Sequence, residues 1–182
     1  MTAPAAVAIR IRPVSLRDGF DLFLRAGHVA AGGAVHPLVL PDLELRLQFD
    51  PRWNPFLRTN AIEAYVALDG DEPVGRIVAI EDRAHLAKHG DGAAHFGFLE
   101  AIDEAKVFAA LIEAAAAWAR ARGLRALAGP YAFSINHEVG LLVSGFDSPS
   151  AVRTPYHPPY YAGHLAALGF RPLKHLVEHR AP

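Results

Sequence analysis

The feature that most constrains the fold is a stretch at residues 61–80, in which two β-rich runs flank a turn. Residues 61–68 alternate in the manner of a half-buried strand, and residues 74–80 form a second run rich in β-branched side chains. Between them, Asp69-Gly70-Asp71-Glu72-Pro73 supplies the residue types that tight turns prefer. The stretch therefore predicts an antiparallel β-hairpin.

The residues before the hairpin predict a strand, a helix and a covering arm. Residues 8–14 alternate as a short strand, and Ser15 is placed to cap a helix that runs through Leu24. Residues 27–55 are rich in glycine and proline, so regular structure there should be brief. We interpret them as an arm that covers the sheet, with one short element at 43–49.

The residues after the hairpin continue to alternate between strand and helix patterns. The predicted elements are a polar loop at 85–92, a strand at 94–102, a helix from an N-cap at Asp103 to Gly123, a strand at 124–128, a loop or short helix at 135–143, a loop at 145–159, a helix at 160–168 and a last strand near 170–177. Gly97, inside a strand, marks a bulge or a close backbone approach. This order predicts an α/β fold of the α+β type with a mixed sheet.

Length and composition limit the possible classes of protein. The 182 residues, 52% of them hydrophobic, are enough for one domain, 1–182, with its own core. A net charge of -1 gives no global field that would attract nucleic acid. The absence of cysteine excludes disulfide scaffolds, thiol nucleophiles and thiolate zinc sites.

The sequence also bears on location. No apolar run reaches the roughly 18 residues that a membrane span requires. The first residues have no basic segment followed by an apolar segment of the kind found in secretory signals. We therefore expect a cytoplasmic protein.

Several motifs resemble those of GNAT acyltransferases, in particular a bacterial branch of uncharacterised two-domain acyltransferases related to the bacterial ceramide synthases. The matching segments are Asn54-Pro55-Phe56, Val74–Ile77, Phe96–Glu100, Gly129-Pro130 to Ser134 with Asn136 and Glu138, Gly140–Val143 with Gly145–Asp147, and Pro158–Tyr161. The hairpin and the Gly169-Phe170 pair also resemble GNAT features. In order, these motifs cover roughly residues 54–177.

The resemblance implies a GNAT fold, with a mixed, mostly antiparallel twisted sheet of about six to seven strands and helices on both faces. Members of this branch are about twice as long and carry a second GNAT-like half, so this chain would correspond to the first half. The implied function is acyl-CoA-dependent N-acylation of an amine, with acetyl-CoA or a longer acyl-CoA as co-substrate.

The resemblance also implies where the co-substrate would bind. Its candidate binding residues in this chain are Phe98, Leu99, Asp103, Lys106 and Asn136. GNAT enzymes usually hold the pyrophosphate of CoA in a glycine-containing loop at a helix N-terminus. Here the corresponding stretch, 101–106, has two carboxylates and no glycine, and carboxylates at a helix N-terminus compete with phosphate. The usual general-acid tyrosine is replaced by Leu165.

Three residues are candidates for the chemistry of acyl transfer. Glu100, at the end of a strand, is the first candidate for the base, although it would equally serve as a solvated strand-end carboxylate. Glu138, beside His137 and Asn136, is a second candidate, and the alternative is that Asn136 caps a short helix. Tyr161 is the candidate acid, unless the Tyr160–Tyr161 pair only anchors packing.

Two other kinds of side chain have structural or metal-binding explanations. Arg76, inside a strand, should pair with Glu63, Glu100 or Asp147. The run from His175 to His179 matches an H-x-x-E-H zinc pattern, but it follows a strand start and has too few residues after it for a third ligand. His85 and His89 have no third ligand nearby in the sequence. We predict no metal.

Two hypotheses of function follow from the sequence. The first is direct acyl transfer from a thioester to a small-molecule or lipid amine, since a covalent cysteine intermediate is impossible. The second is a GNAT-like domain that has lost catalysis and serves in binding or dimerisation, with a homodimer as one form. Neither hypothesis involves nucleic acid.

Overall fold

The computed structural model describes residues 8–15, 17–32, 42–134, 137–147 and 154–177. In chain order the elements are β1 (Arg10–Val14), α1 (Phe20–Ala31), α2 (Asp42–Gln48), α3 (Phe56–Thr59), β2 (Ala61–Asp69), β3 (Glu72–Glu81), α4 (Arg83–His89), β4 (Ala93–Ala101), α5 (Ala105–Arg120), β5 (Ala126–Ala128) and α6 (Tyr160–Ala167). No helix within these ranges is long and apolar enough to span a bilayer.

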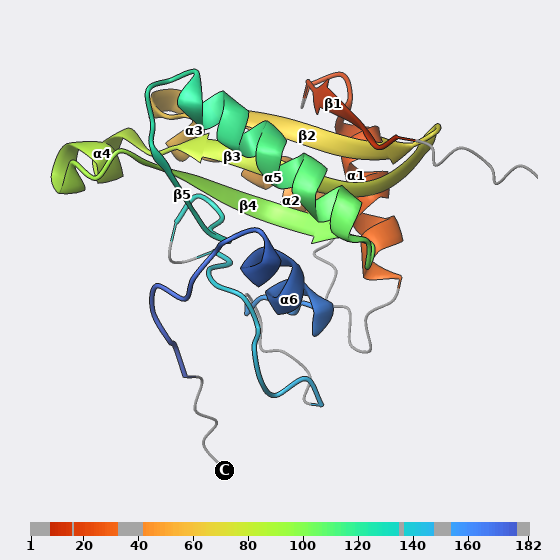
Figure 1. The fold of residues 1–182 in the computed structure, drawn as a ribbon. Helices are drawn as coiled ribbons and strands as arrows, with labels where there is room; N and C mark the ends of the chain where they lie inside the picture. The colour runs from red at the N-terminus through yellow and green to blue at the C-terminus, as the bar shows by residue number, and fades with distance from the viewer. Residues whose placement is uncertain (1–7, 16, 33–41, 135–136, 148–153, 178–182) are drawn as a thin grey trace, which may run out of the picture.

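One sheet organises the molecule, with strand order β1-β2-β3-β4-β5 (Figure 1). All pairs are antiparallel except β4 with β5, which is parallel. The predicted hairpin is confirmed, because β2 and β3 pair from Ala61–Glu81 to Asp69–Glu72 around a turn in which Gly70 has a φ of 62°. The mixed α/β class is therefore confirmed.

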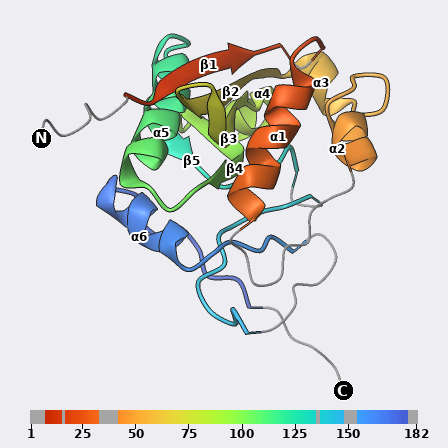
Figure 2. The same ribbon diagram turned by 90° about the vertical axis from the view of Figure 1, so that its right-hand side faces the viewer.

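Helices cover both faces of the sheet (Figure 2). On β3, Ile77 and Ala79 pack with the buried face of α5, whereas Val78 and Ile80 pack with α1 on the opposite face. This alternation follows from the two-residue period of a strand, and it gives each face a separate apolar cluster. Because helices cover both faces of the sheet, β3 is buried on both sides, and its sequence is apolar without alternation.

The strand count is a correction. The described residues contain five strands rather than six to seven, and the strand predicted near 170–177 is absent. Leu173 is 92% exposed there, and Leu176 and Val177 are also exposed. The edge strand β5 has only three residues, so it offers little backbone for a further strand to pair with.

Smaller differences have local causes. The loop predicted at 85–92 contains α4, whose N-cap Asp82 accepts a hydrogen bond from the His85 N–H and whose end is the left-handed Gly90. In the predicted arm, 27–55, the first residues extend α1 and residues 42–48 form α2, while 33–41 lie outside the described residues. Glu104, rather than Asp103, occupies the N-cap position of α5.

The prediction at Gly97 is confirmed in both of its forms. The register of β3 with β4 shifts between Arg76 and Val78, and Phe98 adopts a φ of 51°. A Cβ atom added at Gly97 would lie 2.4 Å from the carbonyl oxygen of Tyr131. The bulge and this close approach mark the point beyond which β4 no longer pairs with β5, whose partners end at His95.

We expect Gly97→Ala to lower the free energy of unfolding by about 1–3 kcal/mol, because the new methyl group would collide with backbone that cannot rotate away. The matched control is Gly163→Ala on α6, where a Cβ would meet nothing within 4 Å. That change should be neutral or stabilise the helix by about 0.5–1 kcal/mol. Chemical denaturation measures both, and equal effects of the two changes would contradict the packing explanation.

Candidate functional site

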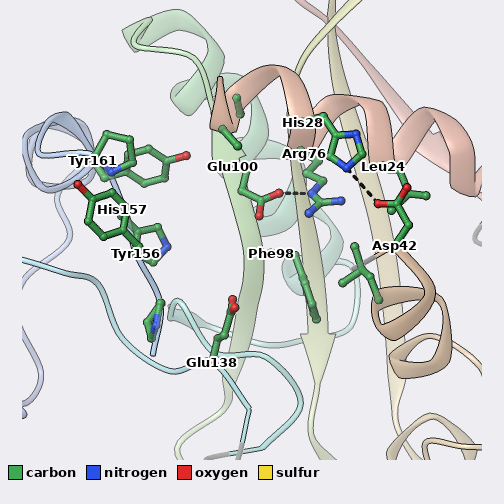
Figure 3. Close-up of a pocket in the computed structure, with 16 residues that line it drawn as sticks. Leu24, His28, Asp42, Arg76, Phe98, Glu100, Glu138, Tyr156, His157 and Tyr161 are labelled. Atoms are coloured by element: carbon green, nitrogen blue, oxygen red, sulfur yellow. Dashed lines mark hydrogen bonds and ion pairs between the residues drawn. The ribbon is translucent and has the colours of Figure 1, made fainter. Parts of the chain in front are cut away.

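A small polar cavity lies beside the bulged half of β4, between the sheet and the α1–α2 pair (Figure 3). Its volume is about 80 Å³. Side chains from β3, β4, α1, α2 and two later segments line it; those that carry the argument are Arg76, Glu100, Glu138, His157 and Tyr161. This volume accommodates reacting head groups rather than a whole ligand, since drug-sized sites measure about 300–1,000 Å³.

Arg76 on β3 links three elements beneath the cavity. Its guanidinium is buried, donates through Nε to Glu100 on β4, and donates through Nη1 to the Phe23 carbonyl on α1 at 3.0 Å. It also lies over the Phe23 ring, with Cζ 4.4 Å from the centroid. Gly27 makes room for it, because a Cβ there would lie 2.4 Å from Cζ. Of the three partners predicted for Arg76, the structure selects Glu100.

Glu100 is the predicted first candidate for the base, and it lies at the cavity as expected. Its partner Arg76 already engages one carboxylate oxygen, Oε2. The side chain keeps 34% of its surface exposed, so the carboxylate also faces the cavity. Glu100 is therefore a fixed anion whose charge is largely matched by a buried cation.

Glu138 is the cavity carboxylate whose pKa is raised. It lies next to Val139, which forms an isolated antiparallel β-bridge with Tyr131. The carboxylate of Glu138 points toward Glu100 (Figure 3). Burial and then repulsion from Glu100 raise its pKa from 4.5 to about 7, while Arg76 opposes the shift. A group with this pKa is deprotonated in about half of the molecules at neutral pH and is a stronger base than an ordinary carboxylate, which suits a general base.

Tyr161 lies at the cavity, but its hydroxyl is already engaged. It accepts a hydrogen bond from the Ala101 N–H at 2.9 Å, and the Tyr160 hydroxyl donates to the Ala101 carbonyl at 2.9 Å. The Tyr161 ring packs edge-on against Phe108, with centroids 4.9 Å apart. Burial raises the pKa of Tyr161 well above its usual value, so the phenol stays protonated.

His157 is a cavity residue that the sequence analysis missed. It is buried, and burial lowers its pKa to about 4, so the imidazole is neutral at physiological pH. Within the described residues its Nδ1 atom has no hydrogen-bond partner. The only signal in the sequence is its place beside Pro158-Pro159, which does not distinguish it from the nine other histidines.

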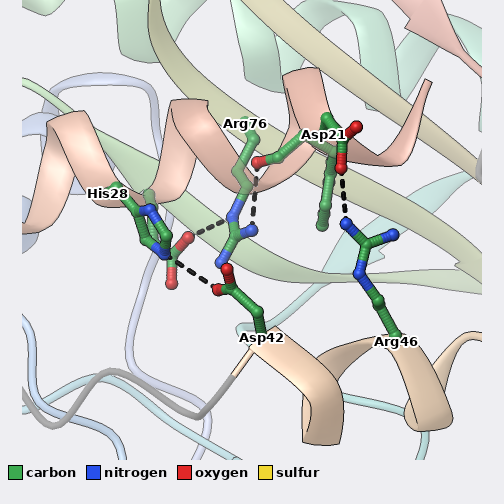
Figure 4. Close-up of polar contacts among 7 residues, drawn as sticks. Asp21, His28, Asp42, Arg46 and Arg76 are labelled. Carbon is green, nitrogen blue, oxygen red and sulfur yellow. Dashed lines mark hydrogen bonds and ion pairs between the residues drawn. The ribbon is translucent and has the colours of Figure 1, made fainter.

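A hydrogen bond and an ion pair join α1 and α2, the two helices that cover one side of the cavity (Figure 4). His28 on α1 contacts Asp42 on α2, with Nε2 and Oδ1 3.0 Å apart, and Arg46 on α2 contacts Asp21 on α1 at 2.5 Å. Both pairs are partly exposed, so each adds little to stability. Their effect is to hold Asp42, a further carboxylate, at the cavity rim.

The other predicted binding residues separate into two groups. Phe98 and Leu99 line a second space of about 20 Å³ that shares Glu100, Glu138 and His157 with the first. Asp103 and Lys106 lie away from both spaces: Asp103 accepts a hydrogen bond from His164 Nε2 at 2.7 Å, and Lys106 Nζ lies 3.6 Å from Asp69. Asn136 lies outside the described residues.

The residues at the start of α5 do not fit a diphosphate. Glu104 occupies the N-cap without a side-chain capping bond, Asp103 precedes it, and the nearest lysine already faces Asp69. Negative side chains at the positive end of a helix are favourable, and they oppose an incoming anion for the same reason. The pyrophosphate of CoA therefore has no matched site at this helix.

No described group of three or more metal-binding side chains has a geometry that would hold a metal ion. The His85 and His89 rings are tilted by 33° to one another with centroids 4.5 Å apart, and His85 Nε2 contacts Asp91 at 2.9 Å. His179, in the H-x-x-E-H match, lies outside the described residues.

The raised pKa of Glu138 predicts a pH-dependent contribution to stability. Because its pKa is higher in the folded than in the unfolded protein, the folded state binds more protons between pH 4.5 and 7. The contribution is present below that window and is lost as the pH rises through it. The free energy of unfolding of the unsubstituted protein, measured relative to Glu138→Gln, should therefore fall by on the order of 1–3 kcal/mol between pH 4.5 and 8.

Denaturation at a series of pH values measures this difference. The control is Glu113→Gln, which removes an exposed carboxylate on α5 and is measured over the same pH range. A difference for Glu138→Gln that does not change with pH would contradict the raised pKa.

Comparison with known proteins identifies the fold. A tandem GNAT protein from the clavulanic acid biosynthesis pathway superposes with a TM-score of 0.56 at 17% identity, over 88% of this chain and 43% of that protein. An aminoglycoside acetyltransferase from an uncultured soil metagenomic sample, solved with trehalose, superposes with a TM-score of 0.50 at 13% identity, over 96% and 95% of the two chains.

Two curated proteins match in sequence. Protein YghO of Escherichia coli K12 is 43% identical over 108 residues, which are 59% of this chain and 28% of YghO. The bacterial ceramide synthase of Caulobacter vibrioides is 37% identical over 132 residues, which are 72% of this chain and 34% of that protein. The matched region thus spans about a third of each relative. No family model matches the chain.

The chain therefore has the GNAT fold and is related in sequence to one region of bacterial ceramide synthase and of YghO.

Proposed function

We propose that this domain transfers an acyl group from a thioester, such as acetyl-CoA or a longer acyl-CoA, directly to an amine, with Glu138 as the general base. The observation that carries the proposal is the carboxylate with a pKa of about 7 at a polar cavity beside the bulge of β4. The likeness to GNAT acetyltransferases supports the reaction class only at the level of fold.

The charges at the cavity suit a cationic amine. Asp42, Glu100 and Glu138 contribute carboxylates, while Arg76 is the one arginine or lysine among the lining residues that the structure describes. An ammonium group placed between Glu100 and Glu138 would relieve their mutual repulsion. Because one sequence relative is named a bacterial ceramide synthase, and a ceramide is an N-acylated amino alcohol, an amino lipid is the favoured acceptor over a small soluble amine.

The proposed reaction begins with proton transfer from the ammonium group to Glu138, which leaves the amine nitrogen with a free electron pair. That nitrogen attacks the thioester carbonyl carbon, and the carbonyl oxygen becomes an oxyanion. As the C–S bond breaks, the second ammonium proton leaves with the thiolate as a thiol. Glu138 then returns its proton to solvent, so an amide, a thiol and one proton are produced.

Glu100 and Tyr161 have supporting roles in this scheme. Arg76 fixes the Glu100 carboxylate, which then holds the ammonium group in place. Tyr161 is a weaker acid than a thiol because its pKa is raised, so it is a poor proton source for the leaving thiolate. Its hydroxyl instead fixes the Ala101 backbone at the end of β4.

Replacement of the proposed base should remove turnover. Glu138→Gln is expected to lower kcat by about 100-fold or more, the usual contribution of a general base. In the unsubstituted protein, kcat/KM should rise with pH and reach half its maximum near pH 7, for an amine whose own pKa is well above that value. Steady-state kinetics against pH measures both.

The control for this experiment is Glu113→Gln, which removes an exposed carboxylate far from the cavity and should leave kcat unchanged. Full activity in Glu138→Gln together with a loss of activity in Glu100→Gln would transfer the role of base to Glu100.

Tyr161→Phe separates an acid from a structural role. We expect a loss of about 1 kcal/mol in the free energy of unfolding, because the Ala101 N–H loses its acceptor. The value of kcat should change by less than about threefold, whereas a general acid would contribute about 100-fold or more. Thermal denaturation and single-turnover kinetics on the same preparation distinguish the two roles.

Two observations favour a second function, a GNAT-like binding domain without catalysis. The start of α5 does not fit the diphosphate of CoA, and the hydroxyl of Tyr161 is bonded to backbone. Calorimetric titration with acetyl-CoA and with a long-chain acyl-CoA discriminates between the functions. Absence of binding to both would contradict the enzyme and support the binding domain.

A further inference from the structure

The start of α5 and the bulged edge of β4 together indicate which part of the acyl donor this domain recognises. The argument rests on the proposed acyl transfer, and it concerns the donor rather than the acceptor.

Negative charge surrounds the N-terminus of α5. Asp103 and Glu104 are both exposed and precede the first turn of the helix. The stretch 101–106 contains one basic residue, Lys106. A helix N-terminus attracts phosphate through its dipole and its free N–H groups. Two carboxylates at the same end cancel that attraction.

Two basic side chains of the described residues near this end, Lys106 and His164, already contact carboxylates. Lys106 Nζ lies 3.6 Å from Asp69, and His164 Nε2 lies 2.7 Å from Asp103. The His164 ring is also stacked on Phe108, with centroids 4.5 Å apart, so α6 holds it in place. A diphosphate would have to break these contacts as well as approach two carboxylates.

The edge of β4 offers backbone groups rather than a helix N-terminus. β5 pairs with β4 only as far as His95, and the Tyr131 N–H then binds the Phe96 carbonyl at 2.8 Å. At the far end, the hydroxyls of Tyr160 and Tyr161 bind the Ala101 backbone. The residues between, Phe98 to Glu100, line the two small spaces instead of pairing with a described strand on this side. A neutral, narrow chain that carries amides matches such a strand edge.

We propose that the domain recognises its donor through the acyl-pantetheine arm alone, so that the nucleotide diphosphate of CoA contributes nothing to catalytic efficiency. The substrate class is a pantetheine thioester, of which acyl-CoA is one form. The diphosphate lies in solvent when acyl-CoA is the donor.

The test compares acyl-CoA with the S-acyl-pantetheine of the same acyl group, with one amine acceptor and the whole chain. The values of kcat/KM should differ by less than about fivefold, and raising the salt concentration should not lower the value for acyl-CoA relative to that for S-acyl-pantetheine, because salt weakens the repulsion between the diphosphate and the two carboxylates. Charge-assisted bonds to a diphosphate would make acyl-CoA better by more than about tenfold, and more so at low salt. That result would overturn the inference and leave acyl transfer intact.

A variant locates the effect at the start of α5. Glu104→Gln should raise kcat/KM for acyl-CoA by about two- to fivefold, because one repulsive charge is removed, and should not change it for S-acyl-pantetheine. Glu113→Gln, in the same helix but remote from its start, should change neither value. A fall with acyl-CoA in Glu104→Gln would also overturn the inference. Absence of turnover with both donors in the unsubstituted protein would contradict the proposed function itself.

Discussion

The buried guanidinium of Arg76 is the interaction on which the arrangement of the candidate site depends. It joins α1, β3 and β4 through the Phe23 carbonyl and the Glu100 carboxylate, and it can do so only because residue 27 is glycine. A buried pair of this kind costs much desolvation, and removal of one partner leaves an uncompensated charge. The Arg76–Glu100 part of the site is therefore built into the core, whereas Glu138 and His157 come from later segments outside the helices and strands. Burial raises the pKa of Glu138 most, and the same two charges modify it, since Glu100 raises the pKa further and Arg76 lowers it.

The bulge at Phe98 has a second effect on the same region. It shifts the register of β4 against β3, and close packing of Gly97 on Tyr131 ends the contact with β5. The two tyrosine hydroxyls of α6 then bind the Ala101 backbone and close the far end of the exposed edge. Backbone strain, a glycine and two phenols thus produce one short open stretch of strand, bounded at both ends and next to two carboxylates.

Local patterns explain which parts could be predicted from the sequence. The β2–β3 hairpin, β4 with Gly97, and α5 follow from alternation, turn residues and helical periodicity, all of which act over a few residues. The prediction of a last strand near 170–177 was wrong, because an extended segment needs the edge of another strand to pair with, and β5 is too short to provide one. α4 was missed although Asp82 and Gly90 carry its capping signals. Arg76, Glu100, Glu138 and His157 lie at one cavity although they are up to 81 residues apart in the sequence, and no local pattern encodes such a contact. Of the contacts among these four residues, the sequence analysis predicted only the Arg76–Glu100 pair, as one of three possible pairs.

The half-protonated state of Glu138 has a thermodynamic consequence for any cation that enters the cavity. A positive charge beside this carboxylate lowers its pKa, so binding near pH 7 releases a fraction of a proton to the medium. The heat of binding then includes the ionisation enthalpy of whatever buffer accepts that proton. Titrations in phosphate and in Tris would give different apparent enthalpies for one and the same affinity, and the slope between them counts the protons that Glu138 loses.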